Sequence, residues 1–360
     1  MSIFLTIFND PKQAEQLTLK QWELLIREAR SANLLAYLAS FLEKNKINNI
    51  PSKAQNHLNA ALIFSYKQRS NVVLECQKLA KIFKAIDVQP IFLKGAAYSI
   101  ANLDLSKTRL LSDIDVLVKK EDLQKAEQAL FQQGWFAEEI TDYDDKYYRQ
   151  WAHEIPPLKH IRRHTILDLH HNILALMTGH IVDTTTLHEN KVESCIVPNT
   201  YTLNNPLLVM HSAVHLFHEG EFDKGLRDLI DIKTMIETFS KSNDNFLAEL
   251  IKTAQYHNFE REIYLAIKYI DLVLNGRFMQ SKGIKALFIN SQKWDSSLLD
   301  FCFVSVFQPY HSNCQSWKKS LAEFLLLWRG HFLRMPITQL IPHLIKKSSI
   351  KLTKLFSKTA

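Results

Sequence analysis

Three short segments of the chain read as strands, whereas the long stretches around them repeat apolar residues every three or four positions. The three segments span residues 88–93, 113–118 and 165–170. Short apolar runs and alternation with a period of two are typical of strands, and a period near 3.6 is typical of helices. The chain is therefore expected to build a small sheet inside a mostly helical protein. The 8 glycines and 10 prolines among 360 residues are too few for the turns of a β-sandwich or a propeller.

The change of period along the chain predicts its organisation. Apolar residues at helical spacing occupy 51–86 and return from 205 to about 272, and an amphipathic helix over 121–133 ends at Gly134. We expect an α+β fold that is mostly α, with a small mixed sheet. The expected units are an N-terminal helical segment (1–86), an α/β core (87–175), a helical domain (176–316) and a basic amphipathic tail (317–360).

Composition excludes several classes of protein. Hydrophobic residues make up 46% and charged residues 22%, enough apolar surface for a globular core. The four cysteines are far apart and form no CxxC pair, which predicts reduced thiols and a cytoplasmic protein. No apolar run reaches the roughly 18 residues of a membrane span, and the N-terminus lacks a secretion signal. We expect no integral membrane segment.

Positive charge is concentrated near the C-terminus. The net charge is 44 − 37 = +7, but residues 317–360 carry nine Lys or Arg and one acid, Glu323, so residues 1–316 sum to −1. The tail places Lys347, Lys351, Lys354 and Lys358 opposite Ile341, Ile345, Leu352 and Phe356. Three interpretations stay open: peripheral contact with an anionic membrane, contact with an RNA backbone, or a terminal helix docked on the body with its charges in water.

Two acids share one face of a predicted strand. In 113–118, Ile114, Val116 and Val118 can face a core while Asp113 and Asp115 face the other way. Their Cα atoms would lie about 7 Å apart, and carboxylates that close repel unless a cation lies between them. Mg²⁺ is suited to this position because it prefers oxygen ligands. The alternative is a solvated strand end whose acids face water.

Three neighbouring features favour a functional site. Lys94, Gly95 and Ala96 stand where a strand ends and a helix begins, so small residues let backbone N–H groups approach a phosphate. Asp168, on the same face of its segment as His170, supplies a third carboxylate. Arg109 precedes Asp113 by four residues and is either a fixed positive charge suited to phosphate oxygens or an ordinary surface Arg.

These motifs resemble the polymerase-β-type nucleotidyltransferase superfamily. The form Leu-Lys-Gly, Arg, Ser-Asp-Ile-Asp-Val-Leu-Val and Asp-Leu-His is closest to its bacterial family of largely uncharacterised nucleotidyltransferases. The resemblance covers about 88–171, and the flanking helical segments agree in type only. It implies that the α/β core is a nucleotidyltransferase core.

The resemblance also implies roles for single residues. Asp113 and Asp115 would hold two Mg²⁺ ions that bridge a nucleoside triphosphate, and Asp168 would complete one metal site and help deprotonate the acceptor hydroxyl. The nucleotide-binding residues would be Lys94, Gly95, Ala96, Arg109 and Ser112, with Gly95 and Ala96 cradling the β- and γ-phosphates. The family pattern usually has Gly-Ser or Gly-Gly where this chain has Gly-Ala, so one hydroxyl contact to phosphate is missing. Lys94 is either a compensating cation or a Lys that extends from the strand end to solvent.

We therefore expect a Mg²⁺-dependent enzyme that transfers a nucleoside monophosphate from an NTP to an unidentified hydroxyl on a small molecule or a protein. One alternative is an RNA-modifying, toxin-type nucleotidyltransferase, although the near-neutral charge of 1–316 argues against a broad RNA surface. The other alternative is a non-catalytic nucleotide-binding adaptor.

Two weaker patterns lie on later predicted helices. His211, His215 and His218 fall on one helix face, which fits either a transition-metal site or histidines packed between helices, some of them lining a substrate cleft. Arg227, Asp228 and Asp231 either orient a substrate or form a surface ion pair. We leave both groups out of the predicted catalytic set.

Overall fold

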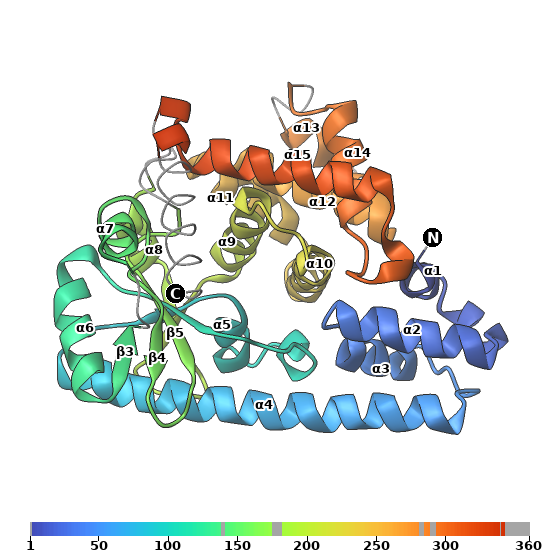
Figure 1. The fold of residues 1–360 in the computed structure, drawn as a ribbon, viewed down its shortest axis with the longest axis horizontal. Coiled ribbons are helices and arrows are strands. Elements are labelled where there is room, and N and C mark those ends of the chain that lie inside the picture. The colour runs from blue at the N-terminus through green and yellow to red at the C-terminus, as the bar shows by residue number, and fades with distance from the viewer. Residues whose placement is uncertain are drawn as a thin grey trace, which may run out of the picture.

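The computed structural model describes residues 2–137, 141–174, 182–280, 284–288, 293–338 and 340–342. A sheet lies at one end of the molecule, the N-terminal helices lie at the other, and the C-terminal helices cover both (Figure 1). The long helix α4 (Ser52–Ala85) runs along the opposite side, under the sheet and under the N-terminal helices (Figure 1). The site described below lies between the sheet and the C-terminal helices.

Seven strands form one mixed sheet in the order β3-β4-β5-β2-β1-β7-β6. They are β1 (Ile91–Phe92), β2 (Ile114–Leu117), β3 (Trp135–Ala137), β4 (Leu158–His160), β5 (Ile166–His170), β6 (Lys191–Glu193) and β7 (Tyr201–Leu203). The pairs β2–β5 and β1–β7 are parallel and the other neighbours are antiparallel. The central position of β2 and β5 explains their buried Leu and Val residues.

Helices make up most of the remaining structure. The N-terminal helices are α1 (Ile3–Asn9), α2 (Leu19–Ser31) and α3 (Leu35–Lys44), and those near the sheet are α5 (Lys94–Ile100), α6 (Leu123–Gln132), α7 (Asp142–Trp151) and α8 (Thr184–Glu189). The C-terminal helices are α9 (Asn205–His218), α10 (Gly225–Ser240), α11 (Phe246–Tyr256), α12 (Glu260–Leu274), α13 (Ile284–Leu287), α14 (Ser297–Val306) and α15 (Trp317–Arg334). Short 3₁₀ helices are η1 (Pro11–Gln16), η2 (Asp104–Lys107), η3 (Lys120–Asp122), η5 (Phe278–Gln280) and η7 (Ser312–Cys314).

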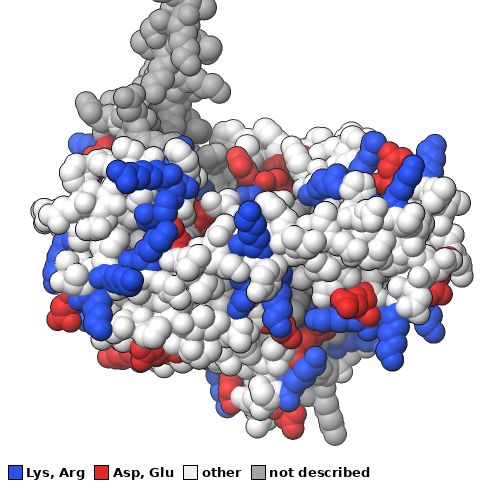
Figure 2. All heavy atoms as spheres, turned by 90° about the horizontal axis from the view of Figure 1, so that it is seen from below, with Lys and Arg blue, Asp and Glu red and all other residues white. Residues whose placement is uncertain are grey.

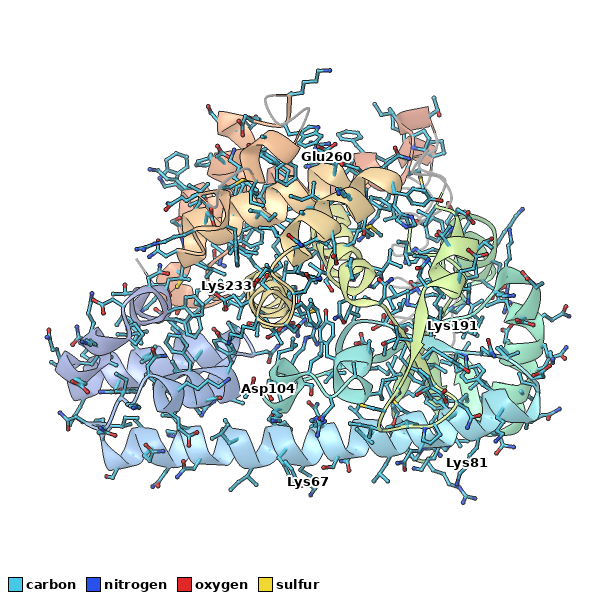
Figure 3. The ribbon with its side chains drawn as sticks, turned by 180° about the vertical axis from the view of Figure 1, so that it is seen from behind. Lys67, Lys81, Asp104, Lys191, Lys233 and Glu260 are labelled. Carbon is cyan, nitrogen blue, oxygen red and sulfur yellow. The ribbon has the colours of Figure 1, made fainter. Side chains whose placement is uncertain are left out.

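Local sequence signals set several helix ends. Thr18 and Gln21 form a capping box at the start of α2, and Asn204 caps α9 by accepting from the Leu207 N–H. The N-terminal helices also contact the C-terminal helices. Lys233 of α10 points toward the N-terminal helices, and its Nζ lies 5.7 Å from the centre of the Phe8 ring (Figure 3). The buried apolar residues therefore form one continuous core.

The structure confirms the predicted fold class, because the protein is mostly helical around a small mixed sheet. Two of its strands, β6 and β7, come from the range that we assigned to the helical domain, since strands of three residues leave little periodic signal. All four cysteines are free. In the described ranges, no helix combines the length and the apolar character needed to cross a bilayer. Lys347, Lys351, Lys354 and Lys358 of the predicted tail lie outside the described residues.

Candidate active site

Two of the three predicted acids are direct neighbours in the sheet. Strands β2 and β5 pair in parallel with Asp115 opposite Asp168, so these residues, 53 positions apart, lie side by side. Asp113 immediately precedes the first residue of β2. The alternative interpretation, in which the acids at this strand end face water, is wrong for Asp115, which is 1% exposed. The reason is that α5 packs against β2 and α9 packs against α5, so helices cover the strand, and all four residues of β2 are buried.

Asp115 is held by two basic groups. The Lys94 ammonium donates to its Oδ1 at 2.7 Å, and the His170 Nε2 lies 3.1 Å from the same oxygen. Burial alone would raise the pKa of the Asp115 carboxyl, but the charge of Lys94 and the contact with His170 outweigh it and hold the pKa well below its usual range. Lys94 therefore pairs with Asp115 instead of extending to solvent, and its role as a cation for the phosphates stays a prediction.

Asp168 has the opposite environment. Burial, then the charges of Asp115 and Glu154, raise the pKa of its carboxyl from 3.8 to about 7. Its Oδ1 is buried and finds no hydrogen-bond partner in the described part of the chain. Asp113 lines one cavity with Lys94 and Asp115, and its charge also raises the pKa values of Asp168 and Lys94. The two neighbouring carboxylates thus have different surroundings. Asp115 is neutralised by basic groups of the protein, whereas Asp168 Oδ1 has no hydrogen-bond partner among the described residues.

The Lys-Gly-Ala segment begins α5 directly after β1. Lys94 has a φ of 46°, a left-handed conformation that a non-glycine residue rarely adopts. Gly95 is required by packing, because a Cβ there would lie 2.6 Å from the Leu111 side chain and 2.8 Å from Arg109 Nη1. Ala96 is 1% exposed. Gly95 lines a cavity, whereas the side chain of Ala96 belongs to the core.

Arg109 does not present a free guanidinium to a ligand. It is buried, with its Nε 2.5 Å from Asp231 Oδ2 and its Nη2 3.3 Å from Asp228 Oδ1, both on α10. It also stacks 5.5 Å from the centre of the Tyr98 ring. Arg109 therefore forms an ion pair that joins the core to α10, in place of the expected contact with phosphate. The surface ion pair expected for Asp231 is also wrong, because Asp231 is buried.

A cavity of about 210 Å³ opens between the acids and helices α9 and α10. We call it the arginine cavity. Its wall includes Gly95, Ser112, Asp113, Asp115 and Arg109 from the core and Lys224, Arg227, Asp228 and Asp231 from the region of α10. Seven acidic side chains and four basic ones line it, so its unliganded charge favours a cation. Ser112, one of the predicted nucleotide-binding residues, lines this cavity and is exposed to solvent.

A second cavity of about 330 Å³, the histidine cavity, shares Lys94 with the first. Its wall includes Asp168, His153, Glu154, His170, His211, His215 and His218. The three α9 histidines do not converge: His215 lies 3.3 Å from Glu219 and His218 lies 3.3 Å from Glu262. They line the cavity, as one interpretation predicted, while ligand atoms of His153, Glu154 and His170 lie within 4.8 Å of one another. Sequence analysis missed His153 and Glu154, which lie in a loop without periodic pattern.

Comparison with known proteins yields one family. A family model described as uncharacterised nucleotidyltransferase matches residues 18–275. No curated protein and no solved structure matches the chain. The matched range contains β1, β2 and β5 with the three acids, and both cavities are lined mainly from it. Since the match covers more than half of the chain, the protein belongs to this family of uncharacterised nucleotidyltransferases, for which an NTP is the implied substrate.

Proposed function

We propose that the protein transfers a nucleoside monophosphate from an NTP to a hydroxyl group of a small molecule or a protein, with Mg²⁺ bound by Asp113, Asp115 and Asp168. One observation carries the proposal: Asp115 and Asp168 are neighbours across β2 and β5 in a chain of a nucleotidyltransferase family. In the reaction, the acceptor oxygen forms a bond to the α-phosphorus. The bond between this phosphorus and the bridging oxygen breaks, and pyrophosphate leaves.

The residues fit a divalent cation. The buried Oδ1 of Asp168 has no hydrogen-bond partner among the described residues, and burial with two nearby acids raises its pKa to about 7. Both features are expected of a carboxylate that binds a metal ion, because the ion replaces the proton. When bound, Mg²⁺ ions neutralise the developing charge on the phosphates and lower the pKa of the attacking hydroxyl.

The protein's own groups would divide the remaining work. The carboxylate of Asp168, kept ionised by the bound Mg²⁺, would help to accept the proton of the acceptor hydroxyl. Lys94 carries a positive charge between the two cavities and would stabilise the leaving pyrophosphate. Gly95 and Ser112 would let the phosphates approach the wall of the arginine cavity without side-chain obstruction. Ala96, with its buried side chain, would contribute only its backbone.

The surface supports a small-molecule or protein acceptor over RNA. On the described part of the face seen in Figure 2, Lys and Arg side chains form separate groups with acidic side chains and uncharged areas between them. Broad RNA recognition uses a continuous basic surface.

Labelling with each α-labelled NTP, Mg²⁺ and a cell extract tests the proposal. The extract is separated afterwards into small-molecule, protein and RNA fractions, and the labelled fraction gives the acceptor class. The Asp113→Asn/Asp115→Asn double variant should lose the labelling. The Asp104→Asn variant is the matched control, because Asp104 is exposed and pairs with Lys107 at the surface. Equal labelling by the wild type and the double variant would remove the two carboxylates from the mechanism.

A further inference from the structure

Three metal-binding side chains meet at the end of β5, beside the acids but distinct from them. His170 is 3% exposed, and its two ring nitrogens serve different groups: Nε2 lies 3.1 Å from Asp115 Oδ1, and Nδ1 lies 3.3 Å from Glu154 Oε2. Within the described ranges this Nδ1 has no hydrogen-bond partner, and neither does the buried Nδ1 of His153. The His153 ring stacks on the His170 ring, with centres 5.2 Å apart.

The backbone fixes this arrangement. Glu154 pairs with His170 in an antiparallel bridge, and Ile155 N donates to Leu169 O at 3.0 Å. The His171 N–H donates to His153 O at 2.8 Å. The loop after α7 is thus bound to the end of a central strand, and the three side chains need little ordering to act together.

We infer that His153, Glu154 and His170 bind one Zn²⁺ ion. Two imidazoles and a carboxylate are a ligand set of zinc sites, with bonds of about 2.0–2.2 Å and a fourth position open to water. Two ligand atoms on a tetrahedral ion at this bond length lie about 3.4 Å apart, which matches the 3.3 Å between His170 Nδ1 and Glu154 Oε2. Mg²⁺ is a poor occupant because it prefers oxygen ligands.

The role of the site follows from the second nitrogen of His170. A histidine that binds a metal through one ring nitrogen usually donates the N–H of the other to a carboxylate, which fixes its tautomer and orientation. Asp115 is this carboxylate. Zinc would thus hold His170 as a neutral ring whose Nε2–H donates to Asp115, so His170 is a positioning residue between the zinc site and the acids.

Cobalt is the probe for the test, because Co²⁺ replaces Zn²⁺ and absorbs visible light characteristically when four-coordinate. Metal-free full-length protein is titrated with Co²⁺ in excess Mg²⁺. We expect one tetrahedral Co²⁺ per chain, displaced by Zn²⁺. His153→Gln and Glu154→Gln should each weaken binding by at least about 100-fold, more than the loss of an outer hydrogen-bond partner. His257→Gln is the matched control, since His257 lies in neither cavity.

The Asp113→Asn variant separates this site from the proposed magnesium site. It should bind Co²⁺ like the wild type, because Asp113 is not part of the cluster. The inference fails if wild-type protein gives no tetrahedral Co²⁺ spectrum, if both His153→Gln and Glu154→Gln keep it, or if Asp113→Asn abolishes it. Circular dichroism verifies the folding of each variant, and Glu154, which is only partly buried, is the safer substitution. The readout is binding, so it does not depend on transfer activity.

Discussion

The two cavities beside Lys94 differ in how their polar groups are satisfied. In the arginine cavity the charges around Arg109 are paired within the protein: Arg109 with Asp228 and Asp231, and Arg227 with Asp228. In the histidine cavity, buried polar atoms lack hydrogen-bond partners among the described residues, namely Asp168 Oδ1 and the Nδ1 atoms of His153, His170, His211 and His218. Buried polar groups are normally satisfied, so those that are not are candidates for contact with a ligand, an ion or water.

The comparison teaches that residue type alone does not identify a binding group. Arg109 has the chemistry to bind phosphate but is used to join the core to α10. Asp168 resembles many surface acids in sequence, yet its buried oxygen is left for a partner. If this contrast is correct, substitutions in the ion pairs of Arg109 should change stability first, and those around Asp168 should change activity first.

Asp168→Asn should have the largest effect. It should lower the rate of transfer and, in the absence of metal, raise the free energy of unfolding. Transfer should fall by at least about 1000-fold, because a metal ion supplies several kcal/mol of transition-state stabilisation. The pKa of Asp168 is raised in the folded state, so the wild type without metal loses stability as the pH rises from about 4 to about 7. At pH 8 in chelator, urea unfolding should therefore show Asp168→Asn as more stable, by about 2 kcal/mol after allowance for solvent screening.

Mg²⁺ should reverse this order of stabilities. It binds the ionised carboxylate and should stabilise the wild type but not Asp168→Asn. A variant that keeps its activity, or whose stability falls in chelator, would show that Asp168 is an ordinary structural acid.

Arg109→Ala should cost about 3–5 kcal/mol of unfolding free energy, because it leaves Asp231 buried without its partner. Urea unfolding measures the loss. Lys107→Ala is the control: it breaks the exposed pair with Asp104 and should change stability by less than about 1 kcal/mol. A stable Arg109→Ala protein with weakened NTP binding would instead restore the phosphate-binding role that the sequence predicts.

Sequence predicts those parts of the site that depend on local periodicity. Alternation placed Asp113 and Asp115 on one strand and put Asp168 on the same face as His170. The structure has both strands, although Asp113 lies just before the first residue of β2. It could not give the parallel register that sets Asp115 beside Asp168, because strand pairing is decided by tertiary packing. Roles for the three acids stay a prediction, as do the three boundaries between the four predicted units.

The missed features all depend on contacts between distant residues. Arg109 and Asp231 are 122 positions apart, so no local pattern could show that they pair. The burial of Asp115 depends on α5 and α9, whose positions an alternating strand does not reveal. His153 and Glu154 reach the site only because their loop pairs with β5.

Gly95→Ala tests the tight packing at the wall of the arginine cavity. The added Cβ would lie 2.6 Å from Leu111 and 2.8 Å from Arg109 Nη1, so these side chains must shift, and we expect a loss of about 1–3 kcal/mol. Thermal unfolding measures it. Gly220→Ala is the control, because its Cβ would meet its nearest atom at 3.4 Å, an ordinary contact. Equal melting temperatures for the two variants would contradict the packing role of Gly95.

The smallest expected effect is a difference in stability between substitutions at two consecutive residues of α9, His211 and Ser212. Ser212 donates to Leu208 O at 2.8 Å, and because a hydroxyl has one hydrogen, the Tyr98 hydroxyl must be the donor to Ser212 Oγ, 2.7 Å away. Ser212→Ala leaves the buried Tyr98 O–H without this acceptor and should lower the unfolding free energy by about 1 kcal/mol. His211→Leu removes an Nδ1 that has no partner in the described structure, so it should change stability by less than about 0.5 kcal/mol. Urea unfolding of both variants measures the difference, and a larger loss for His211→Leu would mean that the histidine cavity is as fully paired as its neighbour.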